Sequence, residues 1–182
     1  MKPERDRDLA GRPRNARPRD GLGRPLDRAD AAVSGSERIP DDLVISGNEA
    51  AVLADQLLRD GRPFHAHEVL EAAWKSGPAE ERDLWQGLAQ IAVGLTHARR
   101  GNARGAVTLL RRGAERVRAH QAGVSAEARA SSRSATGRPA SPFGMDIAAF
   151  LAASDDLAAR IERDGLDRIP PADLSPSLLA RA

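Results

Sequence analysis

Between residues 47 and 120 the apolar positions recur every three or four residues. This is the period of an α-helix that buries one face, whereas a half-buried strand would alternate at every second position. Gly61, Gly77 and Gly101 interrupt the pattern, and glycines at such points are typical of helix ends. Four helices are therefore predicted, and they span about 47–60, 63–75, 79–100 and 103–120.

The two ends of the chain and a stretch after residue 121 lack this period. Residues 1–44 are rich in Arg, Pro, Gly and Asp, and residues 122–143 in Ser, Ala, Gly and Pro. Segments of this kind bury too little apolar surface to offset the entropy of ordering them. Helical spacing returns from Ile147 to Ile161, with Gly165 as the expected stop. The predicted divisions are an N-terminal arm (1–44), a helical core domain (45–121), a flexible linker (122–143), and a C-terminal helix and tail (144–182).

Composition supports an all-α fold. Hydrophobic residues make up 41% of the chain but aromatic residues only 3%, so Ala, Leu and Val must form most of the core. Strands prefer aromatic and β-branched residues, and alanine and leucine favour helices. The connections at Gly61 and Gly101 are short, which favours antiparallel neighbours. We expect an antiparallel bundle of about four helices, with the C-terminal helix packed on it.

Cysteine is absent, which excludes disulfides and thiolate metal sites and is typical of a reducing compartment. The first residues are charged and contain no apolar stretch, so they do not form a secretory signal. No run approaches the roughly 20 apolar residues that span a bilayer. The sequence therefore predicts a cytoplasmic protein without a membrane partner.

The predicted helix over 79–100 carries no charged residue from Leu84 to Ala98. A helix with a solvent-exposed face would normally show charges there, so this helix is expected to be central. At 100° per residue, Gln86, Gln90 and His97 share one face. If that face is buried, these side chains need hydrogen-bond partners, because an unsatisfied buried polar group costs roughly 1–3 kcal/mol.

The helix over 63–75 offers such partners. His67 and Glu71 are one turn apart and Glu68 lies beside them, whereas His65 points elsewhere and is expected to be exposed. Imidazoles and carboxylates together suit a divalent metal. One interpretation is a metal site with hydrolase activity, and two others are a small-ligand site and an internal hydrogen-bond network. In the first interpretation the metal ligands are His67, Glu71 and His97, the general base is Glu68, and the ligand-binding residues are Gln86, Gln90 and Trp74.

The helix over 103–120 suggests a different class of function. Arg104, Arg111 and Arg118 recur every seven residues, opposite an apolar face. A basic helix face beside an Arg-rich arm can bind nucleic acid or an acidic protein without catalysis. A structural protein acting through oligomerisation is a third reading. Within the central helix, Gly87 and Gly94 are seven residues apart, and both predict the close approach of a neighbouring helix.

Polar residues in three consecutive helices follow a recurring pattern. The first helix has His-Glu-x-x-Glu-x-x-Trp, the second has Gln-Gly-x-x-Gln and ends in His, and Gly-Asn-x-x-Gly-Ala follows. The segment from about Leu53 to Leu110 thereby resembles a family of small, helical, mostly bacterial proteins called domain of unknown function 309. The resemblance implies an all-helical fold and gives no established activity, although some members carry the label of predicted metal-dependent hydrolase. The matching positions are His67, Glu68, Glu71, Trp74, Gln86, Gly87, Gln90, His97, Gly101, Asn102, Gly105 and Ala106.

Overall fold

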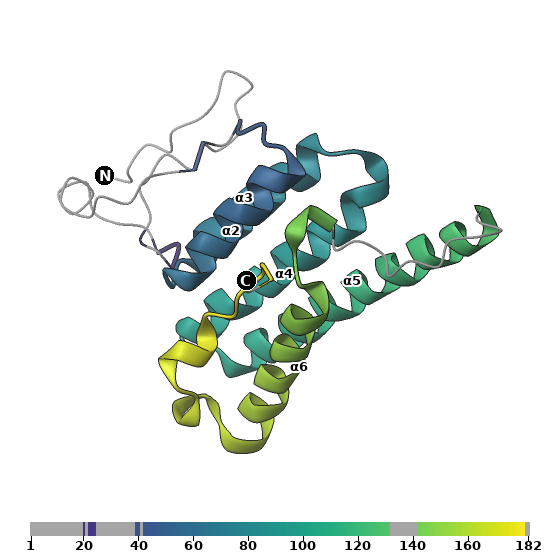
Figure 1. Ribbon diagram of the computed structural model, residues 1–182. Coiled ribbons are helices and arrows are strands. Elements are labelled where there is room, and N and C mark those ends of the chain that lie inside the picture. The colour runs from purple at the N-terminus through teal and green to yellow at the C-terminus, as the bar shows by residue number, and fades with distance from the viewer. Residues whose placement is uncertain (1–19, 21, 25–38, 41, 132–141, 181–182) are drawn as a thin grey trace, which may run out of the picture.

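The described part of the chain is all-α (Figure 1). Its elements are α-helices and short 3₁₀ helices, and no strand occurs among the described residues apart from one isolated bridge between Met145 and Leu179. The predicted fold class is confirmed. The computed structural model describes residues 20, 22–24, 39–40, 42–131 and 142–180.

Each long helix packs against the next one along the chain, which gives the predicted succession of helical hairpins (Figure 1). Their bounds are α2 Gly47–Arg59, α3 Pro63–Ser76, α4 Arg82–Arg99, α5 Ala103–Ser131 and α6 Ile147–Asp164. Four of the five helices start where the sequence predicted, whereas α4 starts three residues later, after a 3₁₀ turn over Ala79–Glu81. Four of the five also end within a few residues of the predicted position.

Local chemistry explains where α2 begins and ends. Ser46 and Glu49 form the predicted capping box, in which the Ser46 N–H donates to Glu49 Oε2 at 3.1 Å and the Glu49 N–H donates to Ser46 Oγ at 3.4 Å. After the helix, Gly61 adopts a φ of 70°, which a residue with a side chain rarely tolerates. The chain can therefore turn at once into α3, which starts at Pro63.

The end of α5 differs from the prediction. The helix continues past His120 to Ser131, through the first half of the stretch predicted to be a flexible linker. Residues 121–131 contain several alanines and no proline, so nothing in them terminates a helix that has already formed. The rest of that stretch, and most of the predicted N-terminal arm, lie outside the described residues.

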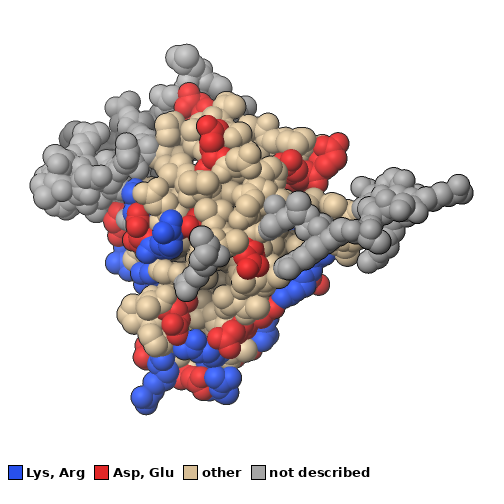
Figure 2. All heavy atoms as spheres, in the orientation of Figure 1, with Lys and Arg blue, Asp and Glu red and all other residues tan. Residues whose placement is uncertain are grey.

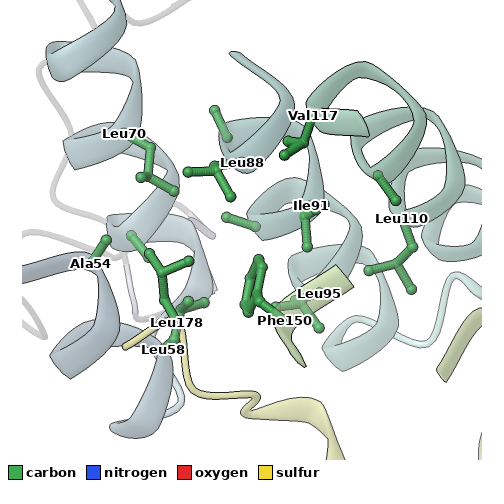
Figure 3. Packing of buried hydrophobic residues seen from close by; sticks show 14 of the residues in the cluster. Ala54, Leu58, Leu70, Leu88, Ile91, Leu95, Leu110, Val117, Phe150 and Leu178 are labelled. Atoms are coloured by element: carbon green, nitrogen blue, oxygen red, sulfur yellow. The ribbon is translucent and has the colours of Figure 1, made fainter. Parts of the chain in front are cut away.

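The core combines side chains from all five helices and the C-terminal segment (Figure 3). Trp85 and Phe150 are its largest fully buried side chains, each 1% exposed. Figure 3 shows Phe150 of α6 beside Leu95 of α4, and Leu178 of the C-terminal segment beside Leu58 of α2. The helix α6 is thus part of the same core as the four-helix bundle.

Two glycine contacts hold α4 and α5 unusually close. A Cβ on Gly87 would lie 2.9 Å from the Gly113 carbonyl oxygen of α5, and one on Gly94 would lie 3.0 Å from the Leu110 nitrogen. Side chains at either glycine would push the helices apart. The predicted close approach of a neighbouring helix at Gly87 and Gly94 is confirmed.

After α6 the chain forms two short 3₁₀ helices, η3 Leu166–Arg168 and η4 Pro171–Leu174. It then returns to the start of α6, where Leu179 pairs with Met145. None of the helices that the structure describes is long and apolar enough to cross a membrane.

Candidate functional site

One side of α3 presents a row of ionisable side chains at four-residue spacing. His67 Nε2 lies 3.4 Å from Glu71 Oε2, and Lys75 Nζ lies 2.8 Å from Glu71 Oε1. Side chains four apart on a helix lie one above the other, so this row follows directly from the sequence. Glu71 is the centre of the row because it contacts both neighbours.

This row lines a cavity of about 310 Å³. Glu68, next to His67 on α3, also lines it. The opposite wall is the segment that precedes α2, including Ile39 and Leu43, which the sequence did not associate with the site. That wall is fixed at its far end, where Ser76 Oγ donates to the Ile45 carbonyl at 3.3 Å. His67, Glu68 and Glu71 therefore share one cavity, as expected for a common site.

The electrostatics of His67 favour a neutral imidazole. Burial lowers its pKa below the ordinary value, and this effect outweighs the Glu71 carboxylate and the Ala89 carbonyl of α4, which both raise it. Its Nδ1 is buried and makes no hydrogen bond of normal geometry. A neutral imidazole has one nitrogen with a free lone pair, which can accept a proton or a hydrogen bond.

Two predicted site residues have partners outside α3, one in α5 and one in the turn between α4 and α5. Gln86 Oε1 accepts a hydrogen bond of 2.7 Å from Arg116 Nη1. His97 Nδ1 lies 2.7 Å from Asn102 Nδ2, and Asn102 Oδ1 in turn accepts the Gly105 N–H at 2.9 Å. Gln86 and His97 were predicted to face α3, but the positions of Arg116 and Asn102 beside them follow only from how α5 packs on α4.

Gln90 and Trp74 are both partly buried. Gln90 is partly exposed, but its Oε1 is buried and has no hydrogen-bond partner. Trp74 is half-buried and packs against the core, whereas Trp85 is fully buried and donates to Glu81 Oε2 at 2.9 Å. Neither Gln90 nor Trp74 lines the α3 cavity.

The histidine expected to be exposed, His65, is 2% exposed and belongs to the largest buried side chains. Its ring makes an edge contact with Phe64, with centroids 5.8 Å apart. The prediction of an exposed His65 was wrong, because α3 is covered on more than one side, by α2 and by α4.

The predicted metal ligands do not form a three-ligand site. Within the described part of the chain, no group of three or more His, Cys, Asp or Glu side chains is arranged to hold a metal ion. Structural and catalytic zinc sites use at least three protein ligands. His67 and Glu71 are adjacent, but His97 is engaged with Asn102 at the turn between α4 and α5. In the described part of the chain, His67, Glu71 and His97 are therefore not arranged as one set of three metal ligands.

The arginines of α5 are not a free basic face. Arg111 makes two hydrogen bonds to Glu162 of α6, at 2.9 and 2.5 Å, and Arg118 pairs with Asp155 of α6. Arg104 remains on the exposed surface. Figure 2 shows basic and acidic side chains interspersed on the face it presents. Two of the three arginines predicted to contact a partner are thus paired within the protein.

Comparison with known proteins confirms the resemblance. Residues 53–109 match the family model described as a domain of unknown function (DUF309). The chain is also 46% identical, over 48 residues, to an uncharacterized protein, YpuF, of Bacillus subtilis (strain 168). That stretch is 26% of this chain and 28% of the relative. No solved structure matches the chain.

Proposed function

We propose that the protein binds a small molecule rich in hydrogen-bond donors in the cavity along α3. The observation that supports this best is that His67, Glu68 and Glu71 line one cavity, and all three belong to the segment that matches the family. A volume of about 310 Å³ lies at the lower end of the range for ligand pockets. The site is therefore suited to a small ligand.

The lining chemistry selects the ligand class. Two carboxylates and a neutral imidazole offer mainly acceptors, and the one cation, Lys75, is already paired with Glu71. Ligand hydroxyl, amide or amine groups can donate to these acceptors. Phe64 and Leu43 add apolar surface for a carbon skeleton.

Catalysis at this site stays a prediction. Glu68 borders the same cavity as His67 and is the candidate general base. Hydrolysis without a metal would require one of these groups to take a proton from water, which a neutral imidazole or a carboxylate can do. Glu68→Gln distinguishes ligand binding from catalysis, because it keeps the shape of the side chain and removes the general base.

The test is a titration of the full chain with small polyols, amides and amines, followed by NMR of the His67 ring. A saturable shift of the His67 signals is expected for at least one compound, with the His120 ring of α5 as an internal reference. Glu71→Gln should weaken that binding at least tenfold, because hydrogen bonds to charged groups contribute about 1.5–3 kcal/mol. Glu80→Gln, an exposed position outside the cavity, is the matched control. If no compound moves the His67 signals, or Glu71→Gln binds as well as the parent, the proposal is wrong.

A further inference from the structure

A second and larger cavity lies between α6 and the C-terminal segment. Its volume is about 560 Å³, well inside the range of small-molecule sites. All of its lining residues fall between 146 and 180, beyond the segment 53–109 that matches the family. None of them lines the α3 cavity, so this site is independent of the function proposed above.

The shape of the cavity comes from small side chains on α6. Ala149 and Ala153 line it one turn apart, where larger residues would fill the space. The C-terminal segment forms the other wall and is held in place at the start of α6, where the Asp146 N–H donates to the Leu178 carbonyl at 3.0 Å. Leu157 and Leu179 add to the apolar surface. Ser175 and Ser177 also line the cavity, so its middle combines small apolar side chains on the α6 side with hydroxyl groups on the other wall.

The charged side chains that line it are three carboxylates (Asp146, Asp156 and Asp173) and one cation, Arg160. Asp146 lies at the N-terminus of α6, where one carboxylate oxygen accepts the Ala149 N–H at 3.0 Å. Further along the helix, Arg160 contacts Asp156 at 3.5 Å and Asp173 at 2.7 Å. Arg160 is thus already engaged by two carboxylates. An anionic ligand would have to displace them, whereas a cationic ligand would meet an excess of negative charge.

We infer that this cavity binds a linear aliphatic polyamine. Asp146 and Asp156 are ten residues apart on α6, which at 1.5 Å per residue separates their backbones by about 15 Å along the helix axis. The terminal ammonium groups of an extended spermine can reach both carboxylates, while its methylene groups lie along Ala149 and Ala153. Its two inner ammonium groups can then contact the serine hydroxyls of the opposite wall. A monoamine can reach one carboxylate only.

The experiment is calorimetric titration of the full chain with spermine at low and at physiological ionic strength. Saturable binding of one spermine per chain is expected, with propylamine at least tenfold weaker. Asp146→Asn should weaken spermine binding at least tenfold while leaving α6 capped, since asparagine is as good an N-cap as aspartate. Asp156→Asn should have a similar effect.

Two matched control variants distinguish binding in this cavity from non-specific attraction of a polycation to the protein surface. Asp167→Asn removes an exposed charge in η3 outside the cavity and should leave spermine binding unchanged. Glu71→Gln, in the α3 cavity, should also leave it unchanged. Ala153→Trp should fill the cavity and abolish binding without removing any charge, and circular dichroism checks that each variant is folded.

Several results would overturn the inference. They are the absence of saturable spermine binding, equal affinities for spermine and propylamine, and a folded Ala153→Trp variant that binds like the parent. Loss of binding in Asp167→Asn to the same extent as in Asp146→Asn would also overturn it, because it would show attraction to the surface charge as a whole.

Discussion

The carboxylate of Asp55, in α2, accepts a hydrogen bond of 2.7 Å from the backbone N–H of Leu178, 123 residues further along the chain. The same oxygen accepts the Leu179 N–H at 3.1 Å and the Ser177 hydroxyl at 2.9 Å, and Arg59 pairs with the other oxygen at 2.8 Å. Asp55 is 2% exposed. One buried carboxylate thus fixes the C-terminal segment to the bundle and, with it, one wall of the α6 cavity.

Replacing Asp55 by alanine should destabilise the protein by about 2–4 kcal/mol, because it leaves two backbone N–H groups without their acceptor. Asp55→Asn keeps an acceptor oxygen and should have a smaller effect. Urea unfolding followed by circular dichroism measures both variants. Asp60→Asn, on the exposed surface beyond α2, is the control and should change stability little. Equal stability of Asp55→Ala and the parent would contradict the role assigned to Asp55.

The same carboxylate should make stability depend on pH. Burial raises the pKa of Asp55, but the N–H groups of Leu179 and Leu178, with Ser177 and Arg59, lower it below the ordinary value overall. A lowered pKa means that the folded state favours the charged form. The contribution is therefore present above the unfolded pKa of about 4 and is lost as the pH falls through the folded pKa. The stability difference between the parent and Asp55→Asn, measured from pH 7 to pH 2, should shrink at the acidic end; a constant difference would argue against this assignment.

The contact between α4 and α5 predicts opposite effects for two glycines of one helix. A Cβ on Gly113 would lie 2.6 Å from the Gly87 carbonyl oxygen and 2.7 Å from Ile91, so Gly113→Ala should destabilise by about 1–3 kcal/mol. Gly123, further along α5, has nothing within 4 Å of its Cβ position. Gly123→Ala should stabilise by up to about 1 kcal/mol through helix propensity. Thermal unfolding of both variants checks the sign of each effect, and a stabilised Gly113→Ala would contradict the packing described.

The turn between α4 and α5 depends on Asn102. Its side chain accepts the Gly105 N–H and contacts the His97 ring, so it caps α5 and orients the histidine together. Asn102→Ala should cost about 1 kcal/mol, as expected for a lost N-cap. It should also shift the NMR signals of the His97 ring. The control Gln56→Ala, on the exposed face of α2, should change neither the stability nor the His97 signals. An unchanged His97 ring in Asn102→Ala would show that the contact does not form in solution.

The separation of His97 from the adjacent pair His67 and Glu71 gives a further test. Elemental analysis of tag-free protein should find no stoichiometric transition metal, and a chelator should leave the unfolding midpoint unchanged, because a bound metal would have stabilised the fold. His67→Ala serves as the comparison. About one equivalent of metal that is present in the parent and lost in His67→Ala would restore the metal interpretation.

The candidate site could be predicted from the sequence only where it lies within one helix. His67, Glu68 and Glu71 share a cavity because their spacing on α3 places them together. The wall formed by Ile39, Pro40 and Leu43 was not foreseen, because that part of the sequence has no periodic pattern that would place it against α3. Gln86 and His97, both in α4, were predicted to face α3. A helical wheel gives the direction of each side chain around its own helix axis, but it does not say which neighbouring helix lies in that direction.

By itself the sequence determined which segments form helices and where most of them begin, since apolar period, capping residues and glycine breaks act over a few neighbouring positions. Only the tertiary structure decided that Arg111 and Arg118 pair with α6, that His65 is buried, and that Asp55 holds Leu178. These contacts join residues far apart in the chain. They depend on how complete helices pack around a shared core, which no local pattern encodes.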